Sequence, residues 1–137
     1  MKLKFIDPSS LDRNLKATVH KSGKIGFTRD ASKKLRLSGP KAAMIAVNEE
    51  NQEDTSLYVI VVDGSTEGAF KINKAGQYYY INTKALFDGM GMDYVNNTYV
   101  YDIVPTEIDG RQVYQFKLRP LKKAKNNPPK EGGQNFR

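Results

Sequence analysis

Apolar and polar residues alternate in short runs along most of this chain, a pattern that indicates β-strands, because successive strand side chains point to opposite faces. Residues 15–27 alternate around the turn Ser22-Gly23 and predict two short strands. Asp109-Gly110 is a strong hairpin signal between the last two apolar runs. The remaining predicted strands cover residues 42–47, 57–62, 68–72, 77–81, 98–104 and 112–118.

Two short helices are predicted between the strands, since two segments carry an N-cap residue followed by apolar residues at helical spacing. The first is expected to end at Ser38-Gly39-Pro40 and the second at Asp88-Gly89. Their expected limits are Thr28 or Asp30 to Leu37, and Asn82 or Thr83 to Phe87.

The predicted fold class is mostly β with two short helices (α+β), in one compact domain over residues 1–120. The order strand, strand, helix, strand, strand occurs twice, at about 15–63 and 68–118, and Ala31 and Ala85 lie 54 positions apart. Leu35-x-Leu37 and Met90-x-Met92 lie 55 positions apart, so the two spacings fit an internal repeat with a slip of one residue. Two architectures remain open: a tandem pair of β-α-β-β units on a shared pseudo-twofold axis, and a small β-barrel.

Charge is segregated along the chain, whose net charge is +7. Residues 1–41 carry eleven Lys and Arg against three acids, residues 42–113 four against eleven, and residues 114–137 seven against one. Clustered Lys and Arg gain affinity for polyanions by releasing counterions from phosphates. Residues 121–137 are rich in Lys, Asn, Pro and Gly and are expected to form a disordered basic tail, because they can bury little apolar surface.

The composition also excludes several kinds of chemistry. Cysteine is absent and His20 is the single histidine, so a thiolate zinc site and a cysteine nucleophile are excluded, and a serine triad would depend on His20 alone. Gly89-Met-Gly91 is too short for a phosphate-binding loop. We therefore expect no enzyme, no cofactor and no metal. No apolar run reaches signal-peptide or membrane-span length, which favours a cytoplasmic protein that does not contact membranes.

The stretch Ser22-Gly-Lys-Ile-Gly-Phe-Thr-Arg-Asp-Ala-Ser-Lys-Lys-Leu-Arg-Leu-Ser-Gly39, followed by two strands, resembles the AbrB/SpoVT swapped-hairpin DNA-binding family over residues 22–62. Thr28 stands where that family usually has a proline. The resemblance implies a bacterial or phage transcription regulator that binds duplex DNA, with a tandem arrangement like that of MraZ-type proteins. It also implies a DNA-facing surface near Lys24, Arg29, Lys33, Lys34 and Arg36.

Basic side chains are the predicted nucleic-acid contacts, because acids are nearly absent among them. Phosphates would be held by the whole group, while Arg29 or Arg36 would contact bases in the major groove. The predicted contacts in the first half are Lys21, Lys24, Arg29, Lys33, Lys34, Arg36 and Lys41, and those in the tail are Lys122, Lys123 and Lys125.

Tyrosines on two predicted strands support an alternative, a module that binds single-stranded DNA or RNA by stacking unpaired bases. Tyr78 and Tyr80 would share one face, with Tyr79 on the other, and Tyr99 and Tyr101 would share a face on the next strand. Packing within the sheet is the favoured interpretation for these rings, because their sequence neighbours are not basic.

A third hypothesis is a structural or assembly protein, such as a phage or multi-subunit component, whose basic ends meet an acidic protein partner. The acidic middle and the basic ends of the chain also permit head-to-tail self-association, so a homo-oligomer remains open. Duplex DNA is the favoured partner among these hypotheses.

Overall fold

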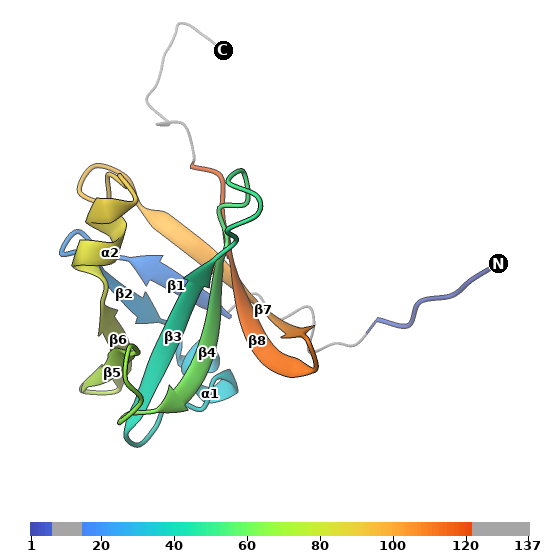
Figure 1. The fold of residues 1–137 in the computed structure, drawn as a ribbon, viewed down its shortest axis with the longest axis horizontal. Coiled ribbons are helices and arrows are strands. Elements are labelled where there is room, and N and C mark those ends of the chain that lie inside the picture. The colour runs from blue at the N-terminus through green and yellow to red at the C-terminus, as the bar shows by residue number, and fades with distance from the viewer. Residues whose placement is uncertain (7–14, 122–137) are drawn as a thin grey trace, which may run out of the picture.

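The chain folds into a closed antiparallel barrel of eight strands with two short helices (Figure 1). The computed structural model describes residues 1–6 and 15–121. The elements are β1 (Lys16–Val19), β2 (Lys24–Phe27), α1 (Arg29–Lys34), β3 (Lys41–Val47), β4 (Leu57–Asp63), β5 (Phe70–Ala75), β6 (Tyr78–Asn82), α2 (Lys84–Gly89), β7 (Tyr99–Ile108) and β8 (Arg111–Leu118).

The strand order around the barrel is β1-β2-β6-β5-β3-β4-β8-β7. The small β-barrel, which the sequence left as the alternative, is therefore confirmed. The prediction of two β-α-β-β units packed against each other is wrong, because four of the strand pairs (β1–β7, β2–β6, β3–β5 and β4–β8) join the first half of the chain to the second. Neither half has a sheet of its own.

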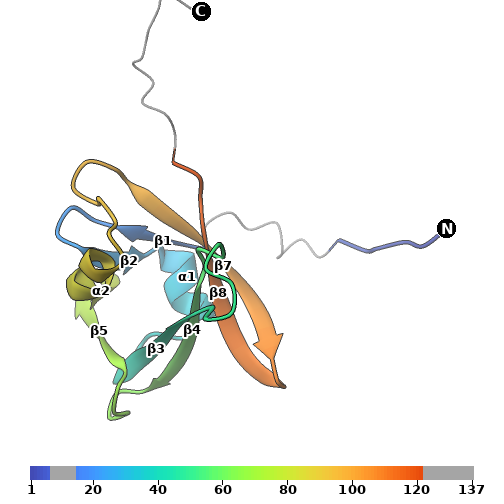
Figure 2. The ribbon, with the colours of Figure 1, turned by 45° about the horizontal axis from the view of Figure 1, so that its top comes forward.

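The barrel order has a symmetry that the pairing itself reveals. Each strand of the first half has a counterpart four strands later: β5 for β1, β6 for β2, β7 for β3 and β8 for β4. When each strand is exchanged with its counterpart, the pairs of neighbouring strands stay the same. Because β2 leads into α1, β6 leads into α2, and the two strands pair antiparallel, the helices lie at opposite ends of these strands, as Figures 1 and 2 show. Internal duplication of the sequence stays a prediction.

The core consists of the side chains that point into the barrel, which are every second residue along each strand. Tyr101 of β7 is fully buried, and its ring packs 6.4 Å from Phe87 of α2 and 6.2 Å from Phe116 of β8, measured between ring centroids. At the other end Leu35 and Leu37, which follow α1, are buried in the same cluster. The helices therefore close the two ends of the core.

Thr28 is the N-cap of α1, and its Oγ1 accepts a hydrogen bond from the Ala31 N–H at 3.3 Å. The alternative cap, Asp30, lies in the first turn instead, so that part of the prediction is wrong. Helix α1 also ends at Lys34, before the expected Leu37, because the chain turns left-handed at Arg36 (φ 55°). In the second half β7 runs past residue 104 to the predicted turn, where Asp109 and Gly110 both have positive φ.

Candidate nucleic-acid interface

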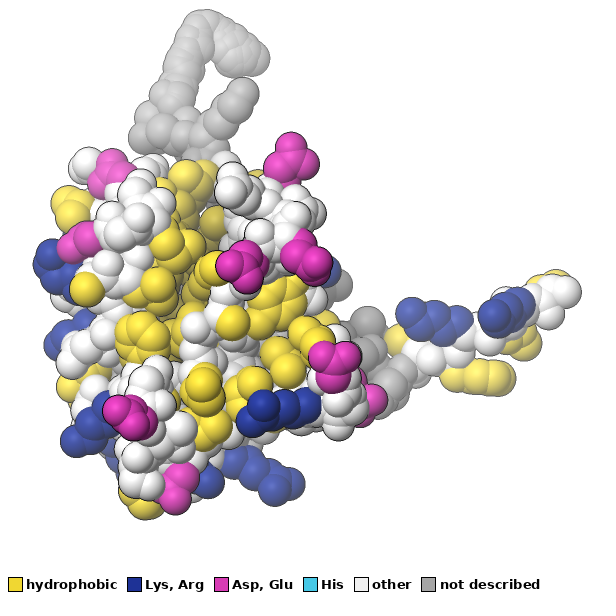
Figure 3. Space-filling model, in the orientation of Figure 1, with side chains coloured by type: hydrophobic (Ala, Val, Ile, Leu, Met, Phe, Trp, Pro, Cys, Tyr) yellow, Lys and Arg dark blue, Asp and Glu magenta, His cyan; other side chains and the backbone are white. Residues whose placement is uncertain are grey.

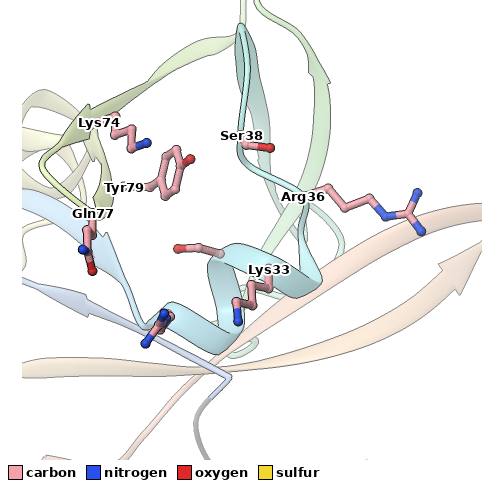
Figure 4. Close-up of a pocket in the computed structure, with 8 residues that line it drawn as sticks. Lys33, Arg36, Ser38, Lys74, Gln77 and Tyr79 are labelled. Atoms are coloured by element: carbon pink, nitrogen blue, oxygen red, sulfur yellow. The ribbon is translucent and has the colours of Figure 1, made fainter.

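Six Lys and Arg side chains line three adjoining surface pockets around α1, and we call this region the basic face. The first pocket, of about 550 Å³, lies between α1 and the β5–β6 hairpin. In Figure 4 Lys74 and Tyr79 lie side by side on the hairpin, and Arg36 is directed away from them beyond the end of α1. The six basic residues are Lys24, Arg29, Lys33, Lys34, Arg36 and Lys74.

Shared residues join the three pockets into one surface. Tyr79 lines both the first pocket and a second one, of about 640 Å³, over β1, β2 and β6. Lys33 and Arg36 line both the first pocket and a third one, of about 500 Å³, which reaches Tyr114 of β8. The surface therefore continues from the outer side of the sheet, past the hairpin, to the far side of α1.

No Asp or Glu of the described residues lines any of these three pockets. Within residues 1–6 and 15–121, ion pairs join only Lys84 to Asp88 and Arg119 to Asp102, both outside the basic face. No side chain of the basic face thus forms an ion pair with a described carboxylate, and Asp30 in the first turn of α1 is the acidic residue nearest to them in the sequence. A surface of this kind raises the local concentration of polyanions.

Two lysines of the basic face lie against tyrosine rings. The Lys24 Nζ is 4.9 Å from the centre of the Tyr80 ring, and the Lys74 Nζ is 5.6 Å from that of Tyr79. Both are cation–π distances. Because β6 alternates, Tyr79 packs against the core cluster while Tyr80 pairs with Gly26 on the neighbouring strand. Charge and aromatic surface therefore occur together here.

Arg36 has an unusual backbone for its residue type. The Leu37 N–H donates to the Ser32 carbonyl at 3.1 Å and the Arg36 N–H to the Lys33 carbonyl at 3.2 Å, which together form a Schellman end with Arg36 in the left-handed position. Helix α2 ends in the same motif, but with Gly91 (φ 72°) in that position. Glycine adopts this conformation without strain, whereas arginine does not.

The predicted basic residues separate into three groups. Lys24, Arg29, Lys33, Lys34 and Arg36 lie on the basic face, as expected from the sequence. Lys21 and Lys41 line none of its pockets: Lys21 lies in the turn between β1 and β2, and Lys41 begins β3. Lys122, Lys123 and Lys125 lie outside the described residues.

The tyrosines separate as well. Tyr78 and Tyr80 line the second pocket, and Tyr78 is 69% exposed. Stacking on Tyr101 is excluded by its complete burial in the core. Tyr99 lies on β7, and its hydroxyl accepts a hydrogen bond from the Asp93 N–H at 3.2 Å.

Three residues of the basic face were missed from the sequence. Lys74, Tyr79 and His20 line its pockets although none was chosen as a contact. The sequence neighbours of the tyrosines are not basic, but their neighbours in the folded protein are. The pairing of β2 with β6 brings Lys24 over Tyr80, so the argument against base stacking from missing basic neighbours is wrong. The alternation of β6 correctly separated Tyr79 from its neighbours, but no local signal identifies which strand pairs with β6.

A second surface of the barrel is mainly apolar. Figure 3 shows hydrophobic side chains gathered on the face that carries β3 and β4, with acidic side chains near them. A pocket of about 520 Å³ there is lined by residues that include Met44, Tyr58, Ile60 and Ile108. This apolar pocket shares no lining residue with the three pockets of the basic face, although β8 contributes residues to both surfaces.

Two carboxylates away from the basic face have lowered pKa values because neighbouring groups donate hydrogen bonds to them. The Tyr58 hydroxyl donates to Asp54 at 2.5 Å and holds the pKa of that carboxyl below its ordinary value of 3.8. The Lys84 ammonium and the Tyr94 hydroxyl lower the pKa of Asp88 in the same direction. These bonds hold the chain before β4 and the chain after α2.

Comparison with protein-family models, curated proteins and solved structures finds no match to this chain. None of the described helices is long and apolar enough to cross a membrane. The described part of the chain also contains no group of three or more His, Cys, Asp or Glu side chains placed to hold a metal ion.

Proposed function

We propose that this protein binds nucleic acid and that the basic face is the binding surface. The observation that carries the proposal is the composition of its three adjoining pockets, which include six Lys and Arg residues and no Asp or Glu of the described chain. A phosphate backbone gives such a surface many contacts at once, and each contact releases a counterion.

The basic residues would contact different parts of the nucleic acid, depending on where they lie. Lys33, Lys34 and Arg36 at the end of α1 are all exposed and would contact phosphates. Arg36 supports the proposal independently, since a strained backbone at a surface arginine is a feature that clusters at functional sites. The Lys24–Tyr80 and Lys74–Tyr79 pairs would add contacts to sugars or bases.

The role as a transcription regulator rests on the resemblance of residues 22–62 to the AbrB/SpoVT family and belongs to the same proposal. That family binds duplex DNA, and the residues that match its basic helix are on the basic face. The resemblance accounts for the charge around α1. It assigns nothing to Tyr79 or Lys74, which come from the second half of the chain.

The test is a fluorescence-anisotropy titration of the full chain with labelled duplex DNA, single-stranded DNA and RNA at several salt concentrations. Replacing Lys33→Glu should weaken binding roughly tenfold and reduce the slope of log K against log salt by about 0.7 to 0.9. The matched control is Lys117→Glu, which makes the same charge change at an exposed β8 residue that lines none of the three pockets.

Equal losses in Lys33→Glu and Lys117→Glu would show that only net charge matters and would remove the basic face from the proposal. Absence of binding to all three probes near physiological salt would refute nucleic-acid binding itself. A concentration-dependent, salt-sensitive oligomer in the same samples, measured by light scattering, would then favour the assembly hypothesis.

A further inference from the structure

The second pocket of the basic face lies over a position without a side chain. Gly26 is the middle of a row of three paired residues on the outer side of the barrel, with Thr18 of β1 on one side and Tyr80 of β6 on the other. All three residues line the pocket of about 640 Å³. These residues line one side of the pocket between β1 and β6, which we call the Gly26 hollow.

His20 approaches the Gly26 hollow closely. A Cβ atom added to Gly26 would lie 2.7 Å from the His20 Nε2, so the imidazole packs where a side chain at position 26 would stand. The backbone conformation of Gly26 is not left-handed. The need for glycine at this position therefore comes from space and not from backbone conformation.

Aromatic side chains line the Gly26 hollow. Tyr80 carries the Lys24 ammonium over its ring, Tyr78 is 69% exposed, and the His20 imidazole stands over Gly26. The pocket volume lies within the usual range of small-ligand sites, about 300–1,000 Å³. Flat rings next to a cation suit a flat, electron-rich ligand, and a nucleobase is such a ligand.

The first pocket adjoins the Gly26 hollow and supplies positive charges for the phosphates on either side of a bound base. Tyr79 lines both, and beyond it lie Arg29, Lys33 and Lys74. A base in the hollow would thus have its strand pass along the phosphate-binding part of the basic face. In a duplex both faces of each base are covered by neighbouring bases, so a base can enter such a hollow only when it is unpaired.

We propose that the Gly26 hollow binds an unpaired base and that the protein therefore prefers single-stranded to duplex nucleic acid. This inference rests on nucleic-acid binding by the basic face and replaces the duplex ligand, which the AbrB/SpoVT resemblance implies, with a single strand. The hollow supplies the preference for unpaired bases, while the six basic residues supply contacts that both forms share.

The experiment alters the Gly26 hollow without changing charge. Gly26→Val places a β-branched side chain, which suits a strand, at the edge of the hollow where the His20 imidazole packs, so the exposed imidazole must move. Full chains are titrated by anisotropy with a labelled single strand of about 15 nucleotides, a length at the upper end of known single-strand sites, and with the same strand annealed to its complement.

Wild-type protein should bind the single strand more tightly than the duplex. Gly26→Val should lower single-strand affinity by roughly 5- to 150-fold, the range that one base stack supplies, and lower duplex affinity by less than about threefold, so that the ratio of the two affinities falls. Tyr80→Leu, which keeps an apolar side chain on β6, should reduce the same preference and serves as the second variant if Gly26→Val does not fold. Thermal unfolding of each variant establishes that it is folded.

The outcomes separate the two proposals. If the wild-type protein binds both probes equally, or if folded Gly26→Val and Tyr80→Leu keep the wild-type ratio of affinities, the Gly26 hollow has no role and nucleic-acid binding by the basic face still stands. If the wild-type protein binds neither probe, both proposals are overturned.

Discussion

Replacing Arg36→Gly should make the protein more stable and a weaker binder. The left-handed backbone of Arg36 (φ 55°) costs a non-glycine residue about 1–2 kcal/mol. Glycine removes this strain but adds about 0.4–1 kcal/mol of conformational freedom to the unfolded chain. The net gain is therefore about 0–1.6 kcal/mol in the free energy of unfolding, and its midpoint of about 0.8 kcal/mol corresponds, for a domain of this size, to a rise of roughly 3–5 °C in Tm.

The same substitution removes one cation from the place where the first and third pockets meet. Affinity for nucleic acid should therefore fall, and the slope of log K against log salt should decrease by about 0.9 for duplex DNA or about 0.7 for a single strand. A rise in stability together with a loss of binding is the signature of a residue kept for function at the expense of the fold.

Thermal unfolding followed by circular dichroism measures the first effect, and anisotropy titration measures the second. Arg36→Ala is the matched control, because it removes the same charge but keeps a Cβ in the left-handed position, so it should lose affinity without the gain in Tm. If Arg36→Gly unfolds at a lower temperature than wild type, the arginine side chain stabilises the helix end and the argument from strain is refuted.

Two further predictions concern residues outside the basic face. Tyr101→Phe should leave nucleic-acid affinity unchanged, because the ring is fully buried, and in the wild-type protein burial raises the pKa of Tyr101 to about 12; a change in anisotropy titrations would contradict the core assignment. Asp54→Asn should weaken the pH dependence of stability in acid. The Tyr58 hydroxyl lowers the pKa of Asp54 in the folded protein. The contribution of the Asp54 carboxylate to the free energy of unfolding is therefore complete well above pH 3.8, and it is lost as the pH falls from that value through the folded pKa. Urea unfolding at a series of pH values measures this, and identical pH profiles for the variant and wild type would rule it out.

The local elements were predictable because their signals are local. The turns at Ser22-Gly23 and Asp109-Gly110, the cap at Thr28 and the alternation of residues 77–81 each depend on neighbours in the chain, and each is found close to its expected place. Element ends moved by a few residues where tertiary contacts extend a strand. Helix α1 is shorter than expected because Arg36 adopts a left-handed backbone conformation, which an arginine in the sequence does not predict.

The charge around α1 was also predictable, since five basic residues of residues 24–36 are neighbours along the chain and all reach one surface. The aromatic part of the basic face was not. Lys74 and Tyr79 are far in sequence from Lys33, and only the insertion of β6 beside β2 brings the hairpin against α1. Choosing that partner depends on closing the whole barrel, which no local pattern specifies.

The amino-acid pattern alone therefore determined that the chain is mostly β, where its strands and helices lie, and that its first half is basic. The closed barrel, the burial of Tyr101 and the meeting of Lys24 with Tyr80 came only from the tertiary structure. The physical reason is that alternation and turn chemistry act between near neighbours, whereas the pairing of non-consecutive strands is selected by the core as a whole.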